Sequence, residues 1–164
     1  MFEVFVISSI VLLAFLNLFW FRLFSNTFLE QGKIIEGKLE RANPFDAGQD
    51  IFSATSVYIP ARSSCLISTG LKIEIPKGCV GLVWSRSGNS VKRKLEVGAG
   101  CIDAGYQGEI LVHLYNHSDV DVLLPMGEKI AQLLTIPINT NNYRKARIFS
   151  EKSKRGSKGF GSSD

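Results

Sequence analysis

The stretch VGAGCIDAGYQGEILVHLYN at residues 97–116 decides the fold, because it joins a Gly-rich turn to an apolar strand. Glycine adopts positive φ at no steric cost, so the three glycines before Tyr106 let the backbone turn sharply and bring its amides near a ligand. Residues 110–115 run β-branched and large apolar side chains together without a helical period, which predicts a strand. Considered alone, Asp103 in such a turn is best explained as an acceptor of turn hydrogen bonds.

The length and the glycine content predict one all-β domain. A chain of 164 residues can bury a sizeable core but leaves little room for a second full domain. It contains 15 glycines, and the runs between them are short and β-branched, as in folds with many strands and turns. Helical periodicity is scarce after residue 41.

The net charge of +4 comes largely from basic residues at 92–94 and 152–158. Short charge runs usually lie in solvated loops. The Gly and Ser residues interleaved in the second run favour a phosphate ligand instead. Because no basic face with interleaved aromatic residues is present, the sequence disfavours nucleic acid as a partner.

The cysteines and histidines do not form a metal motif. Cys65, Cys79 and Cys101 are odd in number and lack CxxC spacing, which predicts reduced, buried thiols in a reducing compartment. His113 and His117 lie four residues apart on a predicted strand and its exit, where they would not face one metal as a helical pair would. The sequence therefore predicts no metal site built by the protein alone.

Residues 1–24 are almost entirely apolar and reach the length of about 20 residues that a helix needs to cross a bilayer. The only charge in the first 20 residues is Glu3, so the segment lacks the basic start of a cleaved signal peptide, and a hydrophobic anchor helix is predicted. Basic residues follow the segment and none precedes it, which predicts a cytoplasmic location for the rest of the chain. A mis-assigned start codon is the alternative.

The remaining chain divides into three parts by composition. Residues 25–43 are polar and of mixed charge, which predicts a linker or a short helix before Pro44. Residues 44–154 carry the strand and turn pattern and form the predicted β domain. Residues 155–164 are rich in Gly and Ser and form a flexible tail.

Two stretches within the β domain point to a phosphate ligand. Residues 71–75 alternate apolar and charged side chains, and a second predicted strand at 79–84 follows. That strand ends in Ser-Arg-Ser-Gly at 85–88, where two hydroxyls, a guanidinium and free amides suit phosphate oxygens. Gln132 interrupts the apolar strand predicted at 128–138, and a buried Gln needs a partner, which is either a core hydrogen bond or a ligand.

Five stretches, in order, resemble those of the trimeric dUTPases, which hydrolyse dUTP to dUMP and pyrophosphate. They are AGQDI at 47–51, SRSG at 85–88, VGAGCIDAGYQGEI at 97–110, GEKIAQLL at 127–134 and RGSKGFGSS at 155–163. The resemblance covers nearly all of residues 33–164. It implies a jelly-roll-like β-barrel, a homotrimer with active sites at subunit interfaces, and a role in limiting uracil in DNA and supplying dUMP for dTMP synthesis. Asn89 and Ser90 depart from the family's more usual Leu-Ala, which puts the local packing in question.

The resemblance assigns roles to the central hairpin. It implies that Asp103 orients and deprotonates the attacking water. Tyr106 would pack on the deoxyribose and leave no room for a ribose 2′-hydroxyl. The backbone around Gly100 and Leu111 would recognise the uracil edge.

The resemblance also implies how the phosphates are bound. Arg86, Ser87 and Gly88 correspond to phosphate contacts of the second stretch, and Gln132 to that of the fourth. Mg²⁺ would be held by the triphosphate and water, with no direct protein ligand. Asp50 would help to order the site near that ion.

The tail would complete the site as a lid. The resemblance implies that Arg155 reaches the terminal phosphate and that Phe160 stacks over uracil. Further phosphate contacts would come from three tail residues, Gly161, Ser162 and Ser163.

Two other functions remain as alternatives. The related dCTP deaminases use a catalytic Glu where this chain has His113, and their second motif tends to Arg-Ser-Ser where residues 86–88 are Arg-Ser-Gly, so deamination is disfavoured. A non-catalytic, membrane-tethered nucleotide-sensing module is the second alternative. Asp103, Arg155 and Phe160 argue against it, because a scaffold needs no carboxylate, guanidinium and stacking ring at those places.

Overall fold

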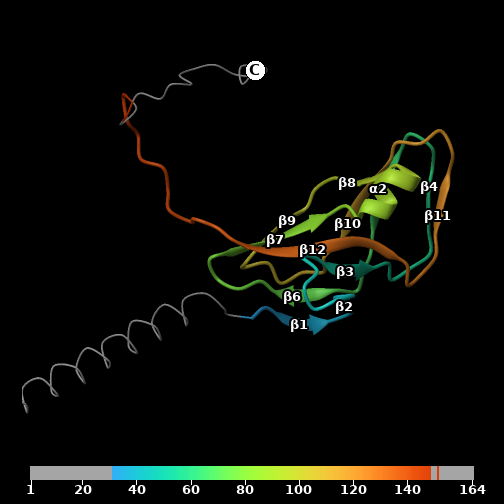
Figure 1. Cartoon of the computed structure of the whole chain (residues 1–164), viewed down its shortest axis with the longest axis horizontal. Helices are drawn as coiled ribbons and strands as arrows, with labels where there is room; N and C mark the ends of the chain where they lie inside the picture. The colour runs from blue at the N-terminus through green and yellow to red at the C-terminus, as the bar shows by residue number, and fades with distance from the viewer. Residues whose placement is uncertain (1–30, 149–150, 152–164) are drawn as a thin grey trace, which may run out of the picture.

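A computed structural model describes residues 31–148 and 151 (Figure 1). The anchor helix predicted at 1–24 lies outside the described residues, and so do five tail residues with predicted roles, Arg155, Phe160, Gly161, Ser162 and Ser163. Across 31–148, no helix has the length and apolar character needed to cross a membrane.

The described residues form twelve strands and one short helix. The elements are β1 (Lys33–Glu36), β2 (Leu39–Glu40), β3 (Gln49–Phe52), β4 (Val57–Ile59), β5 (Ser64–Ile67), β6 (Lys72–Glu74), β7 (Cys79–Trp84), α2 (Ser87–Arg93), β8 (Leu95–Val97), β9 (Cys101–Asp103), β10 (Val112–Asn116), β11 (Val122–Leu124) and β12 (Lys129–Pro137). The prediction of an all-β class is thus confirmed in its main part.

The strands pair antiparallel in four separate sheets (Figure 1). The largest has the order β2-β3-β12-β7-β9, a second has the order β5-β10-β8, and β1-β6 and β11-β4 form two pairs. The predicted jelly-roll-like β-barrel is confirmed only in its β class, because the described strands form no closed barrel. Most strands are too short, and β1 and β12 shift register along their partners, so the pairing stops before the sheets join into a ring.

The core lies between these sheets, and the predicted alternation at residues 71–75 builds part of it. Leu71, Ile73 and Ile75 are buried, whereas Lys72 is half-buried and Glu74 is exposed. Burial of such apolar side chains contributes about 1.5–3 kcal/mol each. The strand predicted at 79–84 coincides with β7.

Residues 33–40 form β1 and β2, although they lie in the stretch that was expected to be a linker. β1 pairs with β6 and β2 with β3. Their short length and mixed charge gave no alternation that would reveal a strand, because both lie at sheet edges.

α2 begins at Ser87, within the SRSG stretch that follows β7, and the sequence analysis did not predict it. Asn89 is buried inside it, and its Nδ2 donates to the backbone oxygens of Lys129 (3.1 Å) and Ile130 (3.2 Å). This packing explains the departure from Leu-Ala, since the amide binds the start of β12 instead of filling an apolar site. The helix ends at Lys94, which adopts the left-handed conformation at φ 54°.

The three cysteines are free thiols with different exposure. Cys65 and Cys79 are half-buried and Cys101 is exposed. The prediction of buried thiols is therefore wrong for Cys101, because side chains alternate along β9, and Ile102 packs against the core while Cys101 faces the other way.

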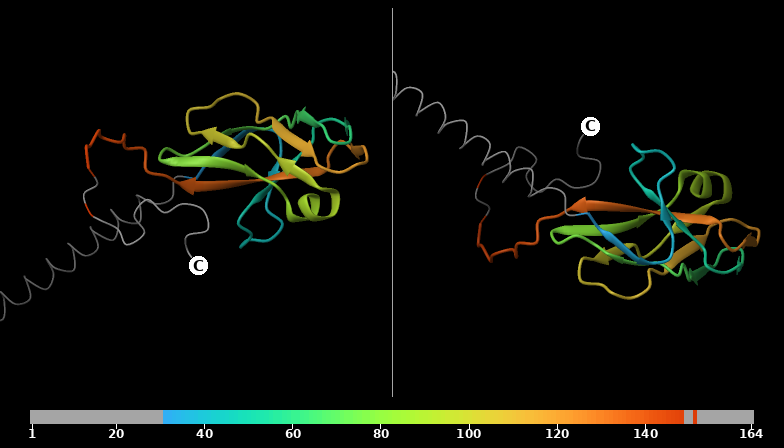
Figure 2. Two further views of the ribbon diagram at one scale, coloured as in Figure 1. Left: turned by 90° about the horizontal axis from the view of Figure 1, so that it is seen from above. Right: turned by 90° about the horizontal axis from the view of Figure 1, so that it is seen from below.

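Residues 138–148 leave the sheets and are exposed along their whole length. They run away from the end of β12, opposite to the end of the domain that carries α2 (Figure 2). This direction separates the C-terminal part of the chain from the remaining strands of its own domain.

Asn116 is a fully buried polar residue at the end of β10. Its Nδ2 donates to the backbone oxygens of Ile59, Pro60 and Val120, and its Oδ1 accepts hydrogen bonds from Ser118. The side chain thus joins the end of β10 to the end of β4 and to the loop before β11.

Replacement of Asn116 by alanine should lower the free energy of unfolding by about 2 kcal/mol, because the buried hydrogen bonds from Asn116 Nδ2 to three backbone oxygens are lost. Urea denaturation of the purified protein measures this change. Asn139→Ala is the control, since the Asn139 side chain accepts only the exposed Asn141 amide. A loss below about 0.5 kcal/mol would contradict the role of Asn116.

Candidate functional site

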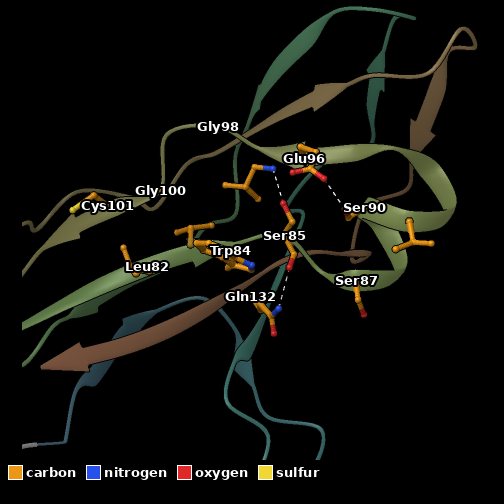
Figure 3. A pocket seen from close by; sticks show the side chains of 13 residues that line it. Leu82, Trp84, Ser85, Ser87, Ser90, Glu96, Gly98, Gly100, Cys101 and Gln132 are labelled. Atoms are coloured by element: carbon orange, nitrogen blue, oxygen red, sulfur yellow. Dashed lines mark hydrogen bonds between the residues drawn. The ribbon is translucent and has the colours of Figure 1, made fainter. Parts of the chain in front are cut away.

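A hollow of about 590 Å³ opens where β7 ends and α2 begins (Figure 3). Its walls come from β7, α2, β8, β9 and β12, so parts of the second, third and fourth motif stretches meet in one place. Ser87, Gly100 and Gln132, each a predicted site residue, line it.

Ser85 connects these stretches, a positioning role that the sequence analysis did not predict when it counted this hydroxyl among those suited to phosphate. Its Oγ accepts a hydrogen bond from the Val97 amide (2.8 Å), and its carbonyl oxygen accepts one from Gln132 Nε2 (3.0 Å; Figure 3). A serine at a strand end gives no signal of such a role, because both partners are distant in sequence. Ser85 fixes the spacing between the loop before α2, the hairpin and β12.

Gln132 was predicted to bind either a hydrogen-bond partner in the core or a ligand, and the structure shows a hydrogen-bond partner within the protein. It is half-buried, and its amide group points from β12 into the hollow toward Ser85 (Figure 3). Gly48 lies against it so closely that any Cβ there would collide with the Gln132 amide. The side chain is held by this hydrogen bond and also lines the hollow, so it can have a structural role and still contact a ligand.

Asp50 holds two cations at the edge of this region. It is buried on β3, with Oδ1 2.8 Å from Arg86 Nε and Oδ2 2.8 Å from Lys129 Nζ. Arg86 and Lys129 remain about one-third exposed, at 33% and 38% of their side chains. Arg86 bonds to Asp50 through Nε, so its two terminal nitrogens can face an anion.

The hairpin brings its own group of predicted residues together. β9 pairs with β7 and ends at Asp103, whose side chain is exposed. The Tyr106 amide donates to the Asp103 carbonyl oxygen (3.0 Å), which closes the turn between them. The Tyr106 hydroxyl donates to the Glu109 carbonyl oxygen at 2.9 Å, and its ring lies against Gly108.

Gly100 has to be glycine for the hairpin to approach β7. Its carbonyl accepts the Val83 amide at 2.8 Å, and a Cβ at Gly100 would lie 2.5 Å from the Val83 carbonyl oxygen. Leu111 follows the hairpin turn and is partly exposed, and Gly88 lies in the first turn of α2 with open space around it.

Within one chain, the predicted site residues fall into two groups. Tyr106 lines a second hollow of about 520 Å³, bounded by residues of β1 and β6, and not the hollow that Ser87 and Gln132 line. Asp103 lines neither of these two. The structure therefore does not bring Asp103 and Tyr106 into the hollow beside the second and fourth stretches.

The carboxylates near the hollow suit a metal ion that is bound mainly by the phosphates of a substrate. Among the described residues no group of three or more His, Cys, Asp or Glu side chains could hold a metal. Both oxygens of Asp50 already contact cations, which leaves this residue suited to an outer position. A Mg²⁺ ion bound to phosphates keeps several waters and needs few protein ligands.

Comparisons with known proteins show the family of the chain. The dUTPase family pattern matches residues 37–164. The chain is 42% identical over 122 residues to the deoxyuridine 5′-triphosphate nucleotidohydrolase of Arabidopsis thaliana, which covers 74% of this chain and 73% of that protein. It is 41% identical over 117 residues to the Candida albicans enzyme of that name, covering 71% of this chain and 74% of that protein.

Solved structures give the same result. The dUTPase of Staphylococcus bacteriophage 80alpha with dUpNHpp is 32% identical, with a TM-score of 0.78 over 83% of this chain and 99% of that chain. A mutant dUTPase of S. aureus phage phi11, described with a structural Mg(II) ion, is 29% identical with a TM-score of 0.67, over 74% of this chain and 98% of that chain. The chain belongs to the dUTPase family.

Proposed function

We propose that this chain is a dUTP diphosphatase, which hydrolyses dUTP to dUMP and pyrophosphate. The observation that carries the proposal is the hollow at the end of β7, where Ser85 joins three of the five family stretches. In this role the enzyme would limit uracil incorporation into DNA and supply dUMP for dTMP synthesis.

The phosphate end of the site neutralises charge on the leaving group. We assign Arg86, Ser87 and Gly88 to the phosphates, with Gln132 beside them. Pyrophosphate release builds negative charge on oxygen, and donors already aimed at that oxygen stabilise the transition state. Asp50 keeps Arg86 in place through Nε. Mg²⁺ bound to the triphosphate would add charge neutralisation.

The nucleoside end would use the hairpin. Asp103 is exposed and can accept a proton from a water, while Tyr106 offers an open ring face to the deoxyribose. The backbone at Gly100 and Leu111 would contact uracil.

The two groups of residues favour a site shared between subunits. We propose a homotrimer in which Asp103 and Tyr106 of one subunit face the phosphate residues of another. The direction of residues 138–148, away from their own domain, supports delivery of the tail to a neighbouring subunit (Figure 1). The tail would contribute Arg155 and Phe160, with Gly161, Ser162 and Ser163.

Release of pyrophosphate from dUTP, dCTP and UTP by the purified full chain tests the function. We expect turnover of dUTP alone, and dependence on added Mg²⁺. Ammonia release from dCTP would favour the deaminase alternative, and nucleotide binding without turnover would favour the sensing module. Equal turnover of UTP and dUTP, or none of dUTP, would contradict the proposal.

Asp50→Asn should lower kcat/KM for dUTP about 10-fold, because a neutral side chain no longer holds both Arg86 and Lys129 in place. The effect should fall mainly on KM. Steady-state kinetics measure it, with Asp119→Asn as a control, since the Asp119–Arg62 pair is exposed. Equal effects of the two substitutions would contradict the role of Asp50.

We also propose that residues 1–24 attach the chain to a membrane with the catalytic domain on the cytoplasmic side. The largely apolar sequence and the basic residues after it support this arrangement. Fractionation of cells expressing the full chain should leave the protein in the membrane pellet after a high-salt wash. Recovery in the soluble fraction would contradict the proposal.

A further inference from the structure

Glu109 ends the Gly-rich turn and binds a loop far away in the sequence. A single carboxylate oxygen, Oε1, accepts hydrogen bonds from Ser68 Oγ (2.5 Å), the Thr69 amide (2.9 Å) and the Gly70 amide (2.8 Å). These donors lie in the connection between β5 and β6. One side chain thus satisfies three donors of this connection.

The neighbouring residue strengthens the same connection. Thr69 Oγ1 donates to the Ile110 carbonyl oxygen at 2.5 Å, and the Ile110 amide donates to the Leu71 carbonyl oxygen at 2.7 Å. Ile110 and Leu71 are both fully buried. Residues 109–110 are therefore fixed to the core, while the turn before them is exposed.

Tyr106 depends on this fixed segment. Its hydroxyl donates to the carbonyl oxygen of Glu109, and its ring packs against Gly108, where a Cβ would lie 2.6 Å from Tyr106 Cζ. The residue is 44% exposed, so part of its surface stays accessible to a ligand. The position of the ring is thus set by a carbonyl whose own position is set by the Glu109 carboxylate.

The carboxylate is charged where it makes these contacts. The Ser68 hydroxyl and then the Gly70 amide hold the pKa of Glu109 below its usual value, and Lys72 adds to the effect. Lys72 itself pairs with Glu36 at 2.8 Å, so it does not replace the loop as the partner of Glu109.

We propose that Glu109 is a positioning residue that holds Tyr106 at the place where the ring excludes a ribose 2′-hydroxyl. This inference rests on the proposed function, in which Tyr106 packs on the sugar. A Tyr106 ring held in a fixed position excludes the ribose 2′-hydroxyl by steric clash. A ring that can move would shift and admit that hydroxyl. Loss of the Glu109 contacts should therefore reduce the preference for deoxyribose more than it reduces binding of the deoxynucleotide.

The test is the ratio of the dissociation constants for dUpNHpp and its ribose counterpart, measured by calorimetry on the full chain. Glu109→Ala should reduce the selectivity about 10-fold. Glu109→Gln should keep more of the selectivity than Glu109→Ala, because the amide keeps an oxygen whose two lone pairs can accept two of the three bonds. Ser68→Ala should shift the ratio in the same direction as Glu109→Ala but by a smaller factor. If Glu109→Ala does not fold, the result for Ser68→Ala tests the positioning role of Glu109.

A double-mutant cycle separates positioning from a general structural role. Tyr106→Phe lacks the hydroxyl that binds the Glu109 carbonyl, so Glu109→Ala in that background should change the selectivity much less. Asp119→Ala, which removes an exposed carboxylate elsewhere, should leave the ratio unchanged.

The outcomes distinguish this inference from the proposed reaction. Unchanged selectivity in Glu109→Ala and Ser68→Ala, with only a lower melting temperature, would overturn the positioning role alone. If the wild-type chain prefers dUpNHpp to its ribose counterpart but does not hydrolyse dUTP, the proposed reaction is wrong. The binding ratios of the Glu109 variants would still test the positioning role. A chain that binds neither analogue would overturn both.

Discussion

Asp103→Asn should lower the turnover of dUTP about 100-fold or more and leave the dissociation constant for dUpNHpp nearly unchanged. Asparagine has the size of aspartate and can still accept a hydrogen bond from water, but it cannot take the proton of that water. Backbone pairing of β9 with β7 holds the residue, and its exposed side chain makes no ion pair with the described residues. The substitution therefore removes a base without removing a contact of the fold.

The measurement combines steady-state kinetics, calorimetry with dUpNHpp and thermal unfolding. Asp119→Asn provides a matched control, because it neutralises an exposed carboxylate outside the site. Turnover within about 3-fold of the wild type would remove Asp103 from its proposed role. A large loss of analogue binding would instead assign the residue to substrate binding.

Deletion of residues 155–164 should lower kcat/KM for dUTP about 100-fold while the β domain remains folded. The physical reason is the loss of a guanidinium, a stacking ring and two hydroxyls that the family resemblance assigns to the substrate. The domain should survive, because its last strand ends at Pro137 and the residues that follow up to 148 are exposed.

Circular dichroism, size-exclusion chromatography and kinetics on the same sample measure this prediction. Removal of Asp164 alone, which lies beyond the last family stretch, is the control. An unfolded or dissociated product would assign the tail a structural role, and full activity would show that it contributes nothing to catalysis.

The sequence predicts those parts of the fold whose causes are local. The alternation at 71–75 and the apolar run at 79–84 each decide which side chains are buried, so the strands there follow directly. α2 could not be predicted in the same way. It has only seven residues, and its buried Asn89 is satisfied by β12, which lies 40 residues later.

The same distinction between local and long-range causes applies to the residues of the candidate site. Motif residues such as Ser87 and Gln132 were found by type and order, and the structure puts both at one hollow. Ser85 and Glu109 were missed as positioning residues, because their roles consist of hydrogen bonds to partners distant in the chain. The closed barrel failed for a related reason, since closure depends on the lengths and registers of many strand pairs together.

The position of β12 has a consequence for synthesis of the protein. β12 lies at the centre of the largest sheet, between β3 and β7, yet it is the last strand that the described residues form. Until the ribosome has made it, β3 and β7 present unpaired edges and the sheet cannot form. A chain truncated before Lys129 would therefore leave the inner edges of β3 and β7 without their partner, and such edges are prone to aggregation.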